Sequence, residues 1–265
     1  MINQILSYIF LLFIGVTSVL FFMGALCIWL LTVWFDKRLV LLHLYSSFWA
    51  SFYIWCMPAW SVSYIGKEKL DWKKQYMIVS NHQSQLDILV AFGLFFPFKW
   101  VSKIEVFSLP FVGWNMRLNR YIGLKRGDKE SIRRMMADCE AQIDRGCSIF
   151  FFPEGTRSFT GELRPFKPGA FILAKEKDIP ILPVVIRGTR EALPKYSLVL
   201  QKNHKITLTI LDEIPISQVR SMPPGEMAAR VRQIIAAHLD KPWDSPAPSQ
   251  SQGKPSWPCS GCPGS

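Results

Sequence analysis

The sequence predicts an α/β domain with a mostly parallel sheet flanked by helices, preceded by an N-terminal hydrophobic two-helix membrane anchor. Strand-like and helix-like segments alternate after residue 66, a pattern typical of a mostly parallel sheet. Residues 148–152 form one apolar run, as expected of a strand buried on both faces. The first 66 residues carry only three Asp, Glu, Lys or Arg side chains, all at 36–38.

Two uncharged runs, 1–35 and 39–66, each exceed the roughly 20 apolar residues that cross a bilayer. A cleaved signal peptide is disfavoured because the N-terminus lacks a basic region and its apolar core is too long. A buried helical hairpin is also disfavoured, because a domain of this size rarely hides two such helices. We therefore expect residues 1–66 to anchor the chain in a membrane. Spanning the bilayer and lying in one leaflet both remain open, since Pro58 interrupts the second run.

The segment 67–244, which is long enough for one domain, contains alternating short strands and helices. Strands are expected at short apolar or aromatic runs, namely 76–79, 99–101, 121–124, 148–152, 181–186 and 205–211. Helices are expected at 86–95, 110–118, 129–145, 170–177 and 224–239. Polar and apolar residues alternate along the last strand, so we expect it to be more exposed than the others.

The helix expected at 129–145 has the clearest boundaries. Asp128 is suited to cap its first turn, and Gly146 is suited to end it. Its apolar side chains fall on one face, which indicates core packing rather than cofactor binding: Ile132, Met135, Met136, Cys139 and Ile143. After the last helix, residues 245–265 consist mainly of Pro, Ser, Gly and Gln, so we expect a disordered tail.

The formal net charge of +11 lies almost wholly after residue 66, which indicates an anionic partner. Nucleic acid and acidic or phosphorylated lipids are both candidates, and the anchor favours lipid over nucleic acid. Lysines directly after Gly66 predict that the domain lies on the cytoplasmic face of the membrane. The pair Cys259 and Cys262 lacks the two further ligands of a zinc site, so no metal is expected.

A histidine and an aspartate stand five residues apart, at His82 and Asp87, between an expected strand and an expected helix. They can meet if His82 lies in the turn and Asp87 in the first turn of the helix. The carboxylate would then fix the imidazole tautomer and leave the other ring nitrogen to accept a proton. A polar turn with a helix cap explains the same residues without any catalytic role.

A second polar cluster, Glu154-Gly155-Thr156-Arg157, follows the apolar strand at 148–152. Open α/β sheets bind ligands at this edge, and the planar guanidinium of Arg157 suits a phosphate. An ordinary turn with a solvated ion pair is the alternative. Lys103 and Arg126 lie near the same predicted sheet edge and would complete a cationic pocket.

Together these motifs resemble the 1-acylglycerol-3-phosphate acyltransferase family of glycerolipid acyltransferases. The resemblance rests on NHQSQLD at 81–87 and on FPEGTRS at 152–158. The segment 103–126 is similar to the family's intermediate block, and ILPVV at 181–185 is similar to its last block. Four blocks in this order cover roughly residues 65–213, most of the expected soluble domain.

The resemblance implies transfer of a fatty acyl group from a thioester donor to lysophosphatidic acid, a membrane lipid, without a cofactor or a metal. His82 is then the general base and Asp87 orients it. Arg157, Arg126 and Lys103 would hold the acceptor phosphate.

The resemblance also assigns Glu154, Gly155 and Thr156 to the acceptor pocket. The donor it implies is acyl-CoA or acyl carrier protein. Another lyso-lipid acceptor remains an alternative. A non-catalytic lipid-binding scaffold is the other, although phosphate binding alone requires neither His82 nor Asp87.

Overall fold

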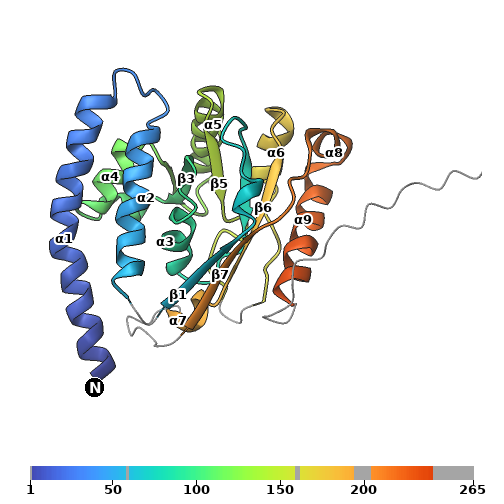
Figure 1. Ribbon diagram of the computed structural model, residues 1–265. Helices are drawn as coiled ribbons and strands as arrows, with labels where there is room; N and C mark the ends of the chain where they lie inside the picture. The colour runs from blue at the N-terminus through green and yellow to red at the C-terminus, as the bar shows by residue number, and fades with distance from the viewer. Residues whose placement is uncertain (1, 58–59, 159–161, 194–203, 241–265) are drawn as a thin grey trace, which may run out of the picture.

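The computed structural model describes residues 2–57, 60–158, 162–193 and 204–240. A single sheet forms the centre of the fold (Figure 1). Its seven strands are β1 (Trp60–Ile65), β2 (Met77–Ser80), β3 (Phe98–Lys103), β4 (Ile122–Leu124), β5 (Ser148–Phe151), β6 (Ile181–Arg187) and β7 (His204–Ile210). Their order across the sheet is β1-β7-β6-β2-β5-β3-β4. Neighbouring strands are parallel except for the antiparallel pair β6–β7, so the expected mostly parallel sheet is confirmed.

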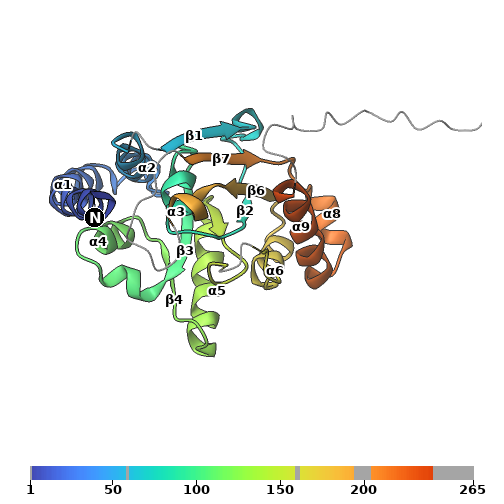
Figure 2. The ribbon, with the colours of Figure 1, turned by 90° about the horizontal axis from the view of Figure 1, so that it is seen from below.

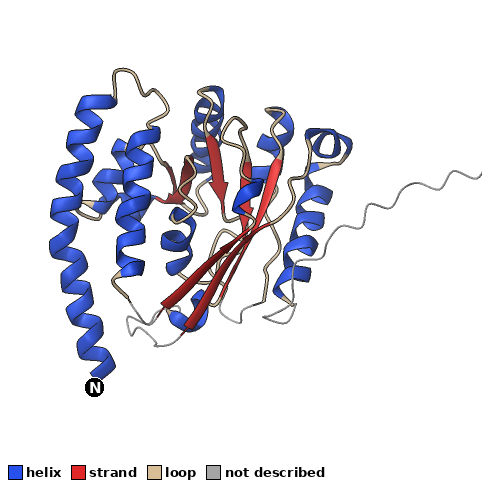
Figure 3. Cartoon of the chain, in the orientation of Figure 1, coloured by secondary structure: helices blue, strands red, loops and turns tan. Residues whose placement is uncertain are grey.

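Helices lie on both sides of the sheet (Figures 2 and 3). The α-helices are α1 (Ile2–Thr32), α2 (Val40–Trp55), α3 (Leu86–Phe92), α4 (Val112–Leu118), α5 (Lys129–Asp144), α6 (Gly169–Glu176), α7 (Thr189–Ala192), α8 (Ile216–Ser221) and α9 (Pro224–Leu239). Two short 3₁₀ helices, η1 (Lys67–Lys69) and η2 (Ile104–Ser108), precede β2 and α4.

Two hydrophobic clusters cover the two faces of the sheet. On β2, Ile78 points into the cluster that contains residues of α2 and α3, and its neighbour Met77 points into the other. The second cluster contains residues of α5, α6 and α9. Because successive side chains of a strand alternate between faces, both faces of the central strands must be apolar. The uniformly buried β2 and β5 follow from this arrangement.

The predicted helix boundaries hold closely at α5. The Asp128 carboxylate accepts the Ser131 N–H at 3.0 Å and caps the first turn. The helix ends at Asp144, and Gly146 follows with a φ of 85°, a conformation that favours glycine. The helix expected at 86–95 is shorter than predicted, because it ends at Phe92 with Gly93 as its cap.

The predicted two-helix membrane anchor is not confirmed. Among the described residues, α1 alone contains a stretch long and apolar enough to cross a membrane, Tyr8–Thr32, and most of this stretch is not buried. Helix α2 has 16 residues, fewer than the roughly 20 needed to cross. Its polar side chains are buried against the α/β domain: Ser46 contacts Asn115 and Asn119, and His43 contacts the Tyr121 hydroxyl at 2.9 Å.

The end of the second uncharged run is not anchor but sheet. Residues 60–65, which the sequence analysis included in 1–66, form β1 and pair in parallel with β7. Alternating burial along β1 explains the exposed serines at 61 and 63. The expected tail at 245–265, with Cys259 and Cys262, lies outside the described residues.

Helix α1 packs along α2 and α4 instead of standing apart from the domain. Tyr53 on α2 places its hydroxyl 3.1 Å from the hydroxyls of both Thr17 and Ser18. Farther along α1, the ring of Phe22 contacts Phe111 and Trp114 at centroid distances of 6.0 and 5.4 Å. These contacts fix the long apolar helix to one side of the α/β domain (Figure 1).

Candidate active site

The loop that carries His82 leaves β2, a central strand of the sheet, and enters α3. Asn81 holds the start of this loop against β6: its side-chain amide donates to the Ile186 carbonyl at 2.8 Å and accepts the Ile186 N–H at 2.9 Å. Ser84 holds the other end, donating its hydroxyl to the Leu193 carbonyl at 2.7 Å. Asn81 therefore bonds the backbone of β6 and Ser84 bonds the backbone after it, and together they fix the position of His82.

His82 and Asp87 meet as the strand–turn–helix arrangement predicts. His82 Nδ1 lies 2.9 Å from Oδ2 of Asp87, the second residue of α3. The same oxygen accepts the N–H groups of Gln83 and Ser84 at 2.7 and 2.8 Å, so the carboxylate is fully buried yet well bonded. The His82 ring also stacks on Phe152 at 4.1 Å between centroids. With Nδ1 donating to the carboxylate, Nε2 is the nitrogen able to accept a proton.

Thr189 completes the environment of Asp87, and the sequence analysis missed it. Its hydroxyl donates to Oδ1 of Asp87, the oxygen that the His82 loop does not use, and Thr189 is fully buried. Thr189 begins α7, directly after β6, which neighbours β2 in the sheet. A hydroxyl just after a predicted strand was the available signal, because parallel neighbours end at the same edge.

Replacing Thr189 by valine removes the hydroxyl and keeps the shape. Thr189 is a positioning residue, because it acts through Asp87 and does not itself move a proton. We expect Thr189→Val to lower kcat about tenfold with little change in KM, since one hydrogen bond to a charged acceptor is lost. Thr189→Ser should restore kcat. Steady-state kinetics with Thr207→Val on β7 as control checks this; a loss that serine does not rescue would contradict it.

Glu154 links the second polar cluster to the His82 loop. Its Oε1 accepts the His82 N–H at 2.7 Å and its Oε2 accepts the Arg164 N–H at 3.1 Å. Burial raises the pKa of this carboxyl, and the two N–H donors oppose that rise. Both carboxylate oxygens thus accept backbone N–H groups, and Glu154 holds the His82 loop against the segment after β5.

The remaining residues of the cluster form the turn after β5. Gly155 has a φ of 70°, and a Cβ added there would lie 3.0 Å from Lys167 Nζ. Thr156 and Arg157 are half-buried. The next residue, Ser158, donates its N–H to the His82 carbonyl at 3.0 Å, which places the turn directly beside the base loop.

The predicted cations come together at the β5-β3-β4 end of the sheet. Burial is the main cause that lowers the pKa of the Arg126 guanidinium; nearby Glu105 raises it and the charge of Arg157 lowers it further. Arg126 and Arg157, which are 31 residues apart in the sequence, therefore lie within electrostatic reach of each other. Two positive side chains at one edge of the sheet suit a dianionic phosphate.

Lys103 belongs to the same cluster through a carboxylate that the sequence analysis missed. Its ammonium lies 3.1 Å from Glu105, and both side chains are about half exposed. No sequence pattern singles out Glu105, because its contacts depend on the turn from β3 into η2. Within the described residues, no group of three or more His, Cys, Asp or Glu side chains is placed to hold a metal ion.

Comparison with known proteins shows similarity to acyltransferases. Residues 61–187 match the family model described as Acyltransferase. Over 153 residues the chain is 38% identical to the chloroplastic 1-acyl-sn-glycerol-3-phosphate acyltransferase BAT2 of Brassica napus, covering 57% of this chain and 44% of that protein. A 1-acyl-sn-glycerol-3-phosphate acyltransferase of Saccharomyces cerevisiae is 37% identical over 191 residues, covering 70% of this chain and 62% of the yeast protein.

The fold has a counterpart among solved structures. The crystal structure of the 1-acyl-sn-glycerophosphate acyltransferase PlsC from Thermotoga maritima matches with a TM-score of 0.75 and 22% identity, over 89% of this chain and 95% of that one. Residues 61–187 match the acyltransferase family, as the motif resemblance predicted. Relatives from Brassica napus, Chlamydomonas reinhardtii and Arabidopsis thaliana are named 1-acyl-sn-glycerol-3-phosphate acyltransferases, and the chain spans about half of their length.

Proposed function

We propose that this protein transfers a fatty acyl group from a thioester donor to the free hydroxyl of lysophosphatidic acid, which gives phosphatidic acid. The His82–Asp87 pair, with the turn that carries Arg157 bonded to the His82 carbonyl, carries the proposal. An acyltransferase needs a base for the attacking hydroxyl, and a phosphorylated acceptor needs cations that position that hydroxyl. The names of the relatives agree with this acceptor.

The residues suggest a direct transfer between the two substrates. His82 Nε2 takes the proton of the acceptor hydroxyl while the oxygen attacks the thioester carbonyl carbon. The carbon–sulfur bond then breaks, and the proton on His82 passes to the leaving sulfur, which gives a free thiol and the new ester. Asp87 stabilises the imidazolium between these steps. The scheme requires neither a covalent acyl-enzyme nor a metal.

Membrane association follows from the same substrate and from the surface of α1. Large apolar side chains of this helix are exposed, among them Leu12, Leu20 and Leu31. Trp114 and Val112 on α4 extend the apolar surface next to α1. This exposed apolar surface is suited to contact a lipid bilayer, where the acceptor and the product both reside. We place the active site at the cytoplasmic face, with acyl-CoA or acyl carrier protein as donor.

Arg157→Lys tests the recognition of the acceptor phosphate. Lysine keeps the charge but loses the planar fork, so bidentate bonding to the phosphate is lost. We expect the efficiency with lysophosphatidic acid to fall about 10- to 100-fold, as for one charge-assisted hydrogen bond. The efficiency with an unphosphorylated monoacylglycerol should fall much less.

The measured quantity is the ratio of kcat/KM for the two acceptors, in wild type and variant. Arg134→Lys on α5, whose side chain is exposed and paired with Glu130, is the matched control. An unchanged ratio in Arg157→Lys would show that Arg157 supports the fold or the donor. The unchanged ratio would also remove this argument for lysophosphatidic acid and favour another acceptor.

A further inference from the structure

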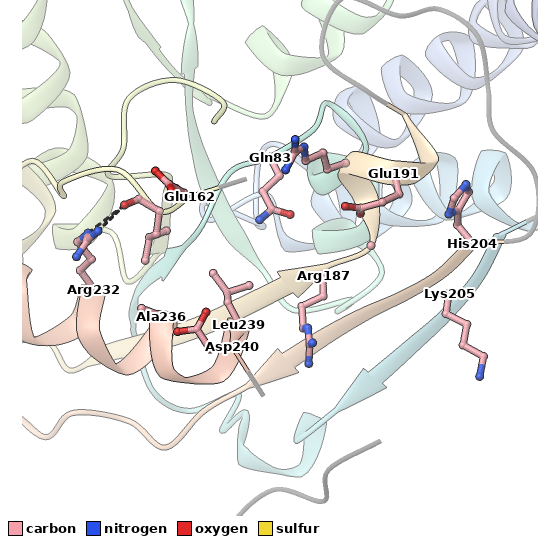
Figure 4. A pocket seen from close by; sticks show the side chains of 13 residues that line it. Gln83, Glu162, Arg187, Glu191, His204, Lys205, Arg232, Ala236, Leu239 and Asp240 are labelled. Carbon is pink, nitrogen blue, oxygen red and sulfur yellow. Dashed lines mark hydrogen bonds between the residues drawn. The ribbon is translucent and has the colours of Figure 1, made fainter. Parts of the chain in front are cut away.

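A pocket of about 970 Å³ lies next to the His82 loop (Figure 4). Gln83, the residue after His82, forms part of its wall. The volume is that of a small-molecule site, and the pocket lies at the sheet edge where α/β folds bind ligands. The proposed acceptor site leaves this pocket unused.

The order of the strands places the two regions on either side of the base. His82 follows β2, in the middle of the sheet. Lys103, Arg126 and Arg157 follow or end β3, β4 and β5, on one side of β2. The pocket is lined by the end of β6, by α7 and by the start of β7, on the other side of β2, and also by α9 and by Glu162 and Leu163, which follow β5. A reacting group at His82 can therefore be approached from both sides.

Cations line the part of the pocket formed by β6, α7 and β7. Arg187 ends β6 and Arg190 lies on α7, and both are half-buried. Between them stands Thr189, whose hydroxyl bonds Asp87, so these two arginines are tied to the catalytic pair by the backbone. Lys205 adds a further positive charge from the start of β7.

Carboxylates in the pocket lie mainly away from this part. Glu162 and Asp240 line the side next to α9, where Arg232 donates to the Leu163 carbonyl (Figure 4). Glu191 is the exception, because it lies on α7 near the cations. The resulting distribution suits a ligand with an anionic group near β6 and α7.

We propose that this pocket binds the phosphate-bearing pantetheine arm of the thioester donor, with Arg187 and Arg190 contacting the phosphate. The inference rests on the proposed function, since an acyl transfer to a phospholipid precursor uses two phosphorylated substrates at one base. The acceptor phosphate occupies the cations on the β5-β3-β4 side, and the donor phosphate occupies those after β6. The thioester carbonyl then meets the acceptor hydroxyl at His82. Coenzyme A and acyl carrier protein both carry this arm.

Donor analogues that differ only in phosphate test the assignment. Wild type, Arg187→Ala and Arg190→Ala are assayed with palmitoyl-pantetheine, palmitoyl-4′-phosphopantetheine, palmitoyl-CoA and palmitoyl acyl carrier protein. We expect each substitution to lower the ratio of kcat/KM for palmitoyl-phosphopantetheine to that for palmitoyl-pantetheine about tenfold. The KM for lysophosphatidic acid should stay unchanged. Arg133→Ala, an exposed arginine on α5, is the control.

The four donors distinguish the possible results. Similar losses with palmitoyl-CoA and palmitoyl acyl carrier protein support a contact to the shared arm, and the wild-type efficiencies show which of the two serves as donor. An unchanged phosphopantetheine ratio in both variants overturns the assignment, as does a higher KM for lysophosphatidic acid. If Arg187→Ala does not fold, Arg190→Ala decides alone, because Arg190 lies on a short surface helix. Wild-type protein inactive with all four donors would instead refute the proposed function.

Discussion

Purified His82→Ala should lose turnover about 10²- to 10⁴-fold while it retains the fold and the binding of lysophosphatidic acid. The substitution removes the only group placed between Asp87 and the acceptor hydroxyl in our scheme, and general-base catalysis contributes about this factor. The cations at Arg126 and Arg157 are untouched, so the acceptor should still bind. The measurement is kcat together with the dissociation constant of lysophosphatidic acid.

His238→Ala is the matched control for that experiment. His238 is a half-buried histidine on α9 that bonds the Ile234 carbonyl within its own helix. Its loss should leave kcat within about twofold, because single hydrogen bonds within a helix contribute little to the distant site. If His82→Ala keeps more than about a tenth of the wild-type turnover, the general-base role of His82 is wrong.

Asp87→Asn should lower kcat about 10²-fold or more, with little change in the structure of the loop. The three donors at Oδ2 require an oxygen there, so the new amide NH₂ must replace Oδ1 and face Thr189. The Thr189 hydroxyl can rotate and accept this N–H, because a hydroxyl both donates and accepts. Geometry is therefore kept, and the negative charge beside the imidazolium is lost.

This substitution separates charge from orientation at the base. Asp128→Asn is the control, because asparagine caps a helix as well as aspartate and Asp128 lies on the surface at α5. The result to compare is kcat against thermal unfolding temperature. Wild-type turnover in Asp87→Asn would show that the charge of the carboxylate is not needed and that Asp87 only holds the loop. A large decrease in the thermal unfolding temperature would show that Asp87 is a structural group.

The local pattern of the sequence was sufficient to predict those features of the structure that depend on residues close together in the chain. The cap at Asp128 and the stop at Gly146 need only a few residues, and both lie where they were predicted. The contact between His82 and Asp87 is equally local, since one turn brings the two side chains together. Residues close in sequence carry this information because the strand–turn–helix geometry has few alternatives.

What the sequence did not reveal depends on residues far apart in the chain. Thr189 reaches Asp87 across 102 positions, and β1 is a strand only because β7 pairs with it. Helix α2 was assigned to a membrane because its hydropathy is high. Its buried polar contacts, such as Ser46 with Asn119, come from α4 and are invisible in a hydropathy pattern. Burial against protein and burial in lipid require similar compositions.

The most direct test is product analysis with the purified full-length protein. Lysophosphatidic acid in lipid vesicles is incubated with palmitoyl-CoA or with palmitoyl acyl carrier protein, and lipids and free thiol are quantified by mass spectrometry. The proposed function predicts phosphatidic acid and free thiol in equal amounts with at least one donor, and both products formed about 10²-fold or more slowly with His82→Ala. Free fatty acid and thiol without phosphatidic acid, or no consumption of either donor by the wild-type protein, would contradict it.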